Sequence, residues 1–168
     1  MKLIITLLTL FMWTPSILAQ QWATMTAKKV ELKILGTSSV HDWESVVENV
    51  DIKAELWMEG GAIKGIQDAQ LIASSKSIES GKSIMNSKIY DALEVDRYPE
   101  IKFQFLELNH ITDVEVALIG DLTIAGITKK VTVISRVEPL SAGILFTGNY
   151  TLDMRDYTID PPTAMMGT

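Results

Sequence analysis

The longest regular alternation of apolar and polar residues runs from Val50 to Glu59. Apolar side chains occupy every second position from residue 50 to residue 58, and charged residues or Trp57 occupy the positions between them. Because successive side chains of a β-strand point to opposite faces, this pattern predicts a strand with one buried face. Gly60-Gly61 follows and predicts a tight hairpin, since such turns require positive φ.

The same two-residue period recurs along the rest of the chain, and short turns join most of the segments. The segment after Gly61 is less regular, so the sequence leaves its inward face open. About seven long strands without a linker predict one antiparallel all-β domain, and their length favours a barrel over a sandwich. The alternating segments span residues 29–35, 50–59, 62–74, 101–105, 114–125, 129–138 and 143–153.

One short helix is predicted between the strands, in the central segment 74–108. Its apolar face comprises Met85, Ile89, Tyr90 and Leu93, at helical spacing. Ser83 and Asn86 are candidate N-caps. Pro99 ends the helical segment, because proline excludes the helical region for the residue before it. We expect this helix to lie across one open end of the barrel and to plug its mouth.

The chain begins with a predicted signal peptide, residues 1–19. Lys2 precedes an apolar stretch that ends near Trp13, and Ala19 provides a small residue for cleavage. The stretch is too short for a lasting membrane span, so we expect a periplasmic or secreted protein without a stable membrane anchor. The remaining residues 20–168 form one domain. It contains no cysteine and must be stable from packing alone, without disulfides.

The net charge of the chain bears on which kinds of partner it can bind. The formal net charge of the 168 residues is −6, and removal of Lys2 with the leader makes it −7. This charge disfavours nucleic acid and anionic membrane surfaces as partners.

Four segments carry motifs that occur in a fixed order. Residues 80–85 read SGKSIM and are followed by YPEIKF at 98–103. SSVHDW spans 38–43, GDLTIAGITKKV spans 120–131, and YTIDPP spans 157–162. Together these motifs resemble those of the YceI-like family of secreted, lipocalin-like proteins that bind polyisoprenoids.

The resemblance implies an eight-stranded, up-and-down, lipocalin-like β-barrel. Relatives usually continue past the position of Met166-Gly167 into a final strand, whereas this sequence stops at Thr168. We therefore expect a C-terminally truncated chain; the alternatives are a barrel closed by the N-terminal segment or by a strand from a partner.

The resemblance also implies a function, namely binding, transport or sequestration of a long apolar lipid in a periplasmic barrel tunnel. The cargo would be a polyisoprenoid or an isoprenoid quinone, with no other cofactor. The alternative is a non-catalytic stress-response or interaction scaffold with a filled barrel. A homodimer remains open.

Apolar residues in phase with the strands and on the helix can either fill the barrel or line a tunnel. The residues alone leave both readings open, and the resemblance favours the tunnel. On that reading the lipid-binding residues are Ile34, Ile52, Leu56, Met85, Ile89, Tyr90, Leu93, Ile101, Phe103, Phe105, Leu118, Leu122, Val133, Phe146 and Tyr150.

Four polar residues are candidates to meet a lipid head group: His41, Asp42, Arg97 and Tyr98. Arginine pairs well with phosphate, although a solvated turn explains Arg97 equally well. Catalysis is not expected, because the sequence shows no nucleophile elbow or phosphate loop. A metal is not expected either, since zinc needs three or four ligands and the chain has only one other histidine, His110, and no thiol.

Overall fold

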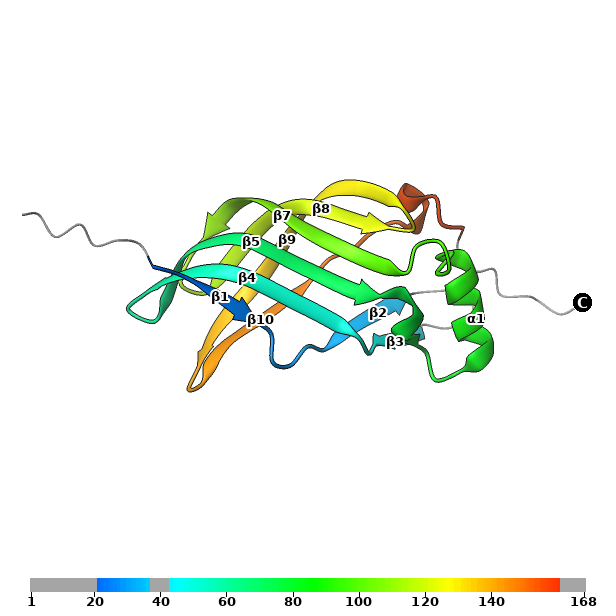
Figure 1. The fold of residues 1–168 in the computed structure, drawn as a ribbon, viewed down its shortest axis with the longest axis horizontal. Helices are drawn as coiled ribbons and strands as arrows, with labels where there is room; N and C mark the ends of the chain where they lie inside the picture. Colours follow the sequence, from blue (N-terminus) through cyan, green and yellow to red (C-terminus); the bar gives the residue numbers. More distant parts are fainter. Residues whose placement is uncertain (1–20, 37–42, 161–168) are drawn as a thin grey trace, which may run out of the picture.

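A seven-stranded antiparallel sheet curls into a half-barrel in the computed structural model, which describes residues 21–36 and 43–160 (Figure 1). The strand order is β1-β4-β5-β7-β8-β9-β10. The strands are β1 (Trp22–Thr26), β4 (Val50–Glu59), β5 (Ala62–Ser74), β7 (Glu100–Ile111), β8 (Glu115–Ile124), β9 (Ile127–Leu140) and β10 (Gly143–Asn149).

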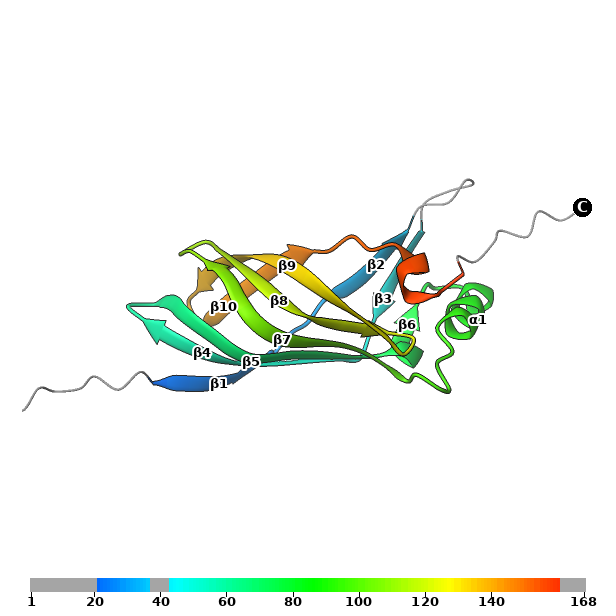
Figure 2. The ribbon, with the colours of Figure 1, turned by 90° about the horizontal axis from the view of Figure 1, so that it is seen from above.

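A smaller sheet and the helix gather at one end of the half-barrel (Figure 2). This sheet has the order β2-β3-β6 and consists of β2 (Leu32–Gly36), β3 (Trp43–Val47) and β6 (Ile78–Glu79). The short helix η1 (Ser75–Ser77) leads into β6, and α1 (Ser83–Ala92) and η2 (Met154–Tyr157) lie at the same end. We call this the helix end. The opposite end, formed by the β4–β5, β7–β8 and β9–β10 turns, is the hairpin end.

The structure confirms the predicted class, an antiparallel lipocalin-like β-barrel fold with a short helix at one mouth, but it changes several strand assignments. The predicted strand 143–153 ends at Asn149, so Tyr150 lies beyond β10. Trp22–Thr26, which lies before the first predicted strand, forms β1 and pairs with β4. The alternating segment 29–35 contributes β2, which pairs with β3 in the small sheet and not with the main sheet. Alternation predicts a strand but not its partner, because pairing depends on distant residues.

The helix also begins and ends differently from the prediction. Its N-cap is Lys82, without a capping side chain. The side-chain oxygen of Asn86 instead accepts hydrogen bonds from the backbone N–H and the hydroxyl of Ser80. The helix ends at Ala92, because Glu94 has a φ of 48° and turns the chain well before Pro99.

β-Bulges produce much of the curl. The β4–β5 register shifts between Lys53 and Glu55, and again between Trp57 and Met58. The β7–β8 register shifts twice in the same way, between residues 105 and 107 and between residues 108 and 110. A bulge increases local twist and bends its strand, so these shifts let a long sheet wrap around its own inner face.

The two edge strands of the curled sheet, β1 and β10, run in the same direction. Each neighbouring pair in the sheet is antiparallel, and seven strands therefore place the first and last strands parallel to each other. Antiparallel pairing cannot join them directly. Within the described residues, the half-barrel consequently has an open side between these edges.

Aromatic rings cover glycines on both faces of the sheet. On the inner face, a Cβ added to Gly120 would lie 2.4 Å from Cζ of Phe103 and 2.5 Å from the carbonyl oxygen of Gln104. On the outer face, a Cβ added to Gly65 would lie 2.7 Å from the indole of Trp22. The absence of a side chain at these positions lets a ring lie flat against the backbone.

We predict that Gly120→Ala lowers the free energy of unfolding by about 2–3 kcal/mol, because the new methyl group overlaps backbone as well as a ring. Gly65→Ala is the matched control. It overlaps only Trp22, on an edge strand that can shift, and we expect it to cost less than about 1 kcal/mol. Urea unfolding measures both, and equal losses would contradict the close approach at Gly120.

Candidate functional site

Two separate apolar clusters pack the interior. The helix-end cluster joins α1, the small sheet and the segment around η2, and its buried members are Val47, Ala73, Ile78, Ile89, Leu93, Val95, Ile124, Tyr157 and Ile159. The hairpin-end cluster contains Leu56, Ile63, Ile66, Ala69, Val116 and Val137. Ile78 and Ala73 are fully buried, so the helix end is closed by packing.

Between the clusters lies a band of inward-facing residues that belongs to neither, which we call the waist. Along β4, Val50 packs on the helix-end cluster and Ala54 on the hairpin-end cluster, while Ile52 between them joins neither. The same holds on β7 for Phe103. The waist comprises Ile52, Phe103, Gly120, Val131 and Val133.

The open side of the half-barrel borders the hairpin-end cluster. Phe146 on β10 is paired with Val137, and Met25 on β1 is paired with Ala54. Directly paired residues share a face of a sheet, so both side chains point inward. They are nevertheless 41% and 42% exposed, because no strand of the described residues covers them there.

The predicted lining residues divide among these three regions. Seven belong to the helix-end cluster or pack against it: Ile34, Met85, Ile89, Tyr90, Leu93, Ile101 and Leu122. Three belong to or pack against the hairpin-end cluster: Leu56, Phe105 and Leu118. The other five, Ile52, Phe103, Val133, Phe146 and Tyr150, belong to neither. The structure therefore shows packed ends, and in the middle it shows inward-facing apolar residues that belong to neither cluster.

The predicted head-group residues do not gather in the waist. His41 and Asp42 lie outside the described residues. Arg97 sits on the surface beside α1, where it forms a 3.5 Å ion pair with Glu94 and its guanidinium lies 5.0 Å from the ring centre of Tyr98. That ring in turn covers Gly126, whose Cβ would lie 2.4 Å from it.

Two tyrosines at the helix end, the half-buried Tyr90 and the buried Tyr157, have different surroundings. The Tyr90 hydroxyl lies 3.0 Å from the carbonyl oxygens of both Lys76 and Ile78 and 3.2 Å from the Glu79 carboxylate. Burial, reinforced by this carboxylate, raises the pKa of Tyr90. The Tyr157 hydroxyl is buried without a hydrogen-bond partner among the described residues, and burial raises the pKa of Tyr157 as well.

The position of Tyr157 depends on the cap of η2. The Asp153 side chain accepts a 2.9 Å hydrogen bond from the backbone N–H of Arg155 and pairs with the guanidinium of the same residue. These contacts lower the pKa of Asp153 to about 2. Sequence reasoning missed both η2 and the role of Tyr157, because an isolated turn of 3₁₀-helix leaves no periodic pattern.

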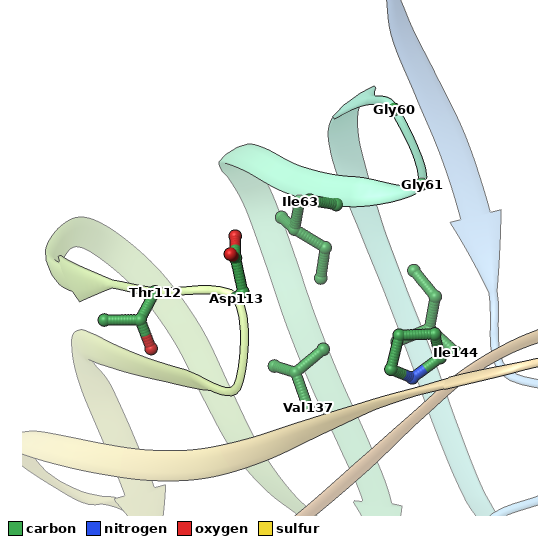
Figure 3. A pocket seen from close by; sticks show the side chains of 9 residues that line it. Gly60, Gly61, Ile63, Thr112, Asp113, Val137 and Ile144 are labelled. Carbon is green, nitrogen blue, oxygen red and sulfur yellow. The ribbon is translucent and has the colours of Figure 1, made fainter.

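A small hollow opens at the hairpin end (Figure 3). Its volume is about 200 Å³, and nine residues from three turns line it: Gly60, Gly61, Ala62, Ile63, Thr112, Asp113, Val137, Pro139 and Ile144. The side chains of Ile63, Val137 and Ile144 bound it from one side, and Asp113 faces them from the β7–β8 turn. Sequence analysis did not identify this hollow, because turns that are distant in sequence form it together.

Residues 21–36 and 43–160 contain no group of three or more His, Cys, Asp or Glu side chains placed to hold a metal ion. Among those same residues, α1 and the two short helices lack the length and apolarity to cross a membrane.

The curled antiparallel sheet, its apolar inner face and the helix across one end define a lipocalin-like β-barrel protein. A sequence profile of the YceI-like domain matches residues 32–168. The chain therefore belongs to the YceI-like family. The comparison with curated proteins finds no match.

Solved structures share the fold at low sequence identity. BcnA from Burkholderia cenocepacia is 17% identical, with a TM-score of 0.67 over 77% of this chain and 80% of its own. A YCEI protein from Campylobacter jejuni is 16% identical, with a TM-score of 0.61 over 79% of each chain. A polyisoprenoid binding domain from Saccharophagus degradans, described as implicated in plant cell wall breakdown, is 16% identical, with a TM-score of 0.57 over 82% of this chain and 77% of its own.

We predict opposite effects for two hydroxyl deletions. Tyr90→Phe removes the hydrogen bonds to the carbonyls of Lys76 and Ile78 and should lower the free energy of unfolding by about 1 kcal/mol. Tyr157→Phe removes a hydroxyl without a partner and should be neutral or stabilising. Thermal and urea unfolding of the two variants measure this difference, and a larger loss at Tyr157 would contradict the environments described.

The same pair has a predicted pH dependence. A tyrosine with a raised pKa in the folded state favours the neutral form there, so its contribution is complete below about pH 10 and is lost as the pH rises above that value. The wild-type protein should therefore lose stability on the alkaline side, and the double variant Tyr90→Phe/Tyr157→Phe should lose less. An unchanged alkaline slope in the double variant would contradict the assigned pKa shifts.

Proposed function

We propose that this protein binds a long apolar lipid, a polyisoprenoid or an isoprenoid quinone, and carries or sequesters it. The waist carries the proposal. It is an apolar band inside a barrel-type sheet, with a packed cluster at each end and no membership of either cluster. Membership of the YceI-like family and the fold shared with a polyisoprenoid binding domain support it. No catalytic step is part of this function.

The chemistry of the waist suits an apolar chain. Its side chains are aliphatic or aromatic, and the ring of Phe103 lies against Gly120 on the inner face of β8. Burial of about ten methylene or methyl groups at about 0.8 kcal/mol each gives roughly 8 kcal/mol before the cost of immobilising the lipid. Apolar contact alone can therefore support useful affinity.

We also propose that the protein acts in the periplasm or outside the cell. The predicted signal peptide, residues 1–19, supports this location, and its cleavage would leave Gln20 as the first residue. N-terminal sequencing of the protein from a periplasmic fraction tests it. A chain that retains Met1 or stays in the cytoplasm would contradict it.

Filling the waist should prevent lipid binding. Val133 points inward from β9, and Val133→Trp should weaken binding at least tenfold, because the indole takes the space of the ligand chain. Ile134→Trp is the matched control on the neighbouring, outward-facing position, which is 52% exposed. Retinol, an isoprenoid alcohol whose fluorescence increases in apolar surroundings, is the probe, and its titration gives the affinity of each variant.

Folding must be checked beside binding, since the larger side chain can also disturb packing. Thermal unfolding of both variants serves that purpose, and Ile52→Trp with Lys53→Trp provides a second inward and outward pair on β4. If the wild-type protein takes up no retinol, the carrier function is wrong and the filled-barrel scaffold is favoured. If folded inward variants bind as well as their controls, the lipid lies elsewhere.

A further inference from the structure

The two ends of the half-barrel differ in what they offer to a lipid head group. At the helix end, Ile78 and Ala73 are fully buried and Tyr157 and Ile159 are nearly so, which leaves packed side chains across that end. A wider hollow of about 570 Å³ beside α1 is lined mainly by charged residues, and its cations Lys76 and Arg97 are paired with Asp96 and Glu94. At the hairpin end, the 200 Å³ hollow opens between three turns (Figure 3). Counting about 30 Å³ for each water-sized group, it can hold roughly six of them. That volume is too small for a whole long lipid but sufficient for one end of it.

The hollow is apolar inside and acidic at its rim. Of its nine lining residues, which all belong to the described part of the chain, Asp113 alone carries a charge. The three turns and the adjoining strand ends carry four carboxylates: Glu59, Asp113, Glu115 and Glu138. They carry two cations, Lys64 and Arg136. Carboxylates therefore exceed cations around this mouth.

Both cations already face carboxylates. Lys64 lies 3.9 Å from Asp113, and Arg136 lies 3.1 Å from Glu138. Arg136 is also the strand partner of Glu115. Of these groups only Asp113 lines the hollow, because Glu59, Glu115 and Glu138 follow or precede inward-facing residues of their strands and so point to the outer face. A phosphate or diphosphate group placed in the hollow would therefore be repelled by Asp113 and would have to compete with it for Lys64. An uncharged head group would meet neither obstacle.

We infer that the lipid is bound with its head group in the hollow at the hairpin end and its chain along the open side of the half-barrel, past the exposed inward face of Phe146, toward the waist, and that the site selects an uncharged head group, such as an alcohol or a quinone, over a phosphorylated one. This inference rests on the proposed lipid-binding function. Asp113 is the specificity-determining residue in this arrangement, because it is the charge that lines the hollow. The Thr112 hydroxyl is already engaged by the backbone N–H of Glu115, at 3.0 Å.

The test compares two ligands that differ only in the head group. Farnesol and farnesyl diphosphate are each titrated against bound retinol, with the wild-type protein and two variants, at low ionic strength, where exposed charges are least screened. Asp113→Lys reverses the charge in the hollow. Asp91→Lys is the matched control, since it makes the same change of net charge on an exposed residue of α1, at the other end of the molecule.

For each variant, the affinity for farnesol is divided by the affinity for farnesyl diphosphate. Comparison of this ratio between variants cancels the different water solubility of the two ligands. We expect the wild-type protein to favour farnesol, Asp113→Lys to reduce that preference about tenfold through the reversed charge, and Asp91→Lys to leave it unchanged. Raising the salt concentration should diminish the effect at Asp113.

Three results would overturn the inference. Equal binding of the two ligands by the wild-type protein would refute the selectivity. A larger effect from Asp91→Lys than from Asp113→Lys would place the head group at the helix end. Uptake of retinol with no response to either substitution would leave the lipid-binding function standing and remove the proposed orientation. Absence of any retinol uptake would instead remove the function on which the inference rests.

Discussion

The apolar inner face of one curled sheet must be shielded from water, and the rest of the structure follows from how this is achieved. A flat sheet could meet the requirement only by packing on a second layer of equal size. Here the bulges in β4–β5 and β7–β8 bend the sheet around its own inner face. Each end is then closed differently, by α1 and the small sheet at one end and by side chains beneath the hairpin turns at the other.

Among the described residues, the middle of the sheet presents apolar side chains that belong to neither packed cluster. Phe103 lies against Gly120, so a large ring takes up little of the space above β8. The edge strands β1 and β10 run parallel to each other and do not pair, and this keeps Phe146 and Met25 exposed although they point inward. An exposed inward-facing apolar surface of this kind is unfavourable in water, and an apolar ligand is one means of covering it. The curl of one sheet thus accounts both for the packed ends and for the inward-facing apolar residues of the waist.

Alternation and helical spacing predicted most of the elements correctly. The pattern from Val50 to Glu59 matches β4 in full, and the spacing of Met85 and Ile89 identified α1. Patterns within a segment could not show which strands pair, so the separate pairing of β2 with β3 was missed. They also could not show β1, where Trp22 and Met25 fall on opposite faces of a short edge strand with little regular alternation.

The candidate site was only partly predictable for the same reason. Inward-facing residues such as Ile52, Phe103 and Val133 could be read from strand phase, but Ile89 and Leu93, taken from the same apolar pattern, turned out to be packed into the helix-end cluster. Whether an inward residue is packed or free depends on residues far away in sequence. The hairpin-end hollow and the unpaired hydroxyl of Tyr157 likewise arise from tertiary contacts, which no local pattern encodes.

Photolabelling is the most direct test of the central claim, that an apolar lipid occupies the waist. An isoprenoid alcohol with a diazirine on its chain would be bound, irradiated and located by peptide mapping. The account predicts labels on inward residues of adjacent strands, Ile52, Phe103 and Val133, and competition by unlabelled farnesol. Labels confined to outward residues such as Ile134 and Leu145, or labelling that farnesol does not reduce, would contradict it.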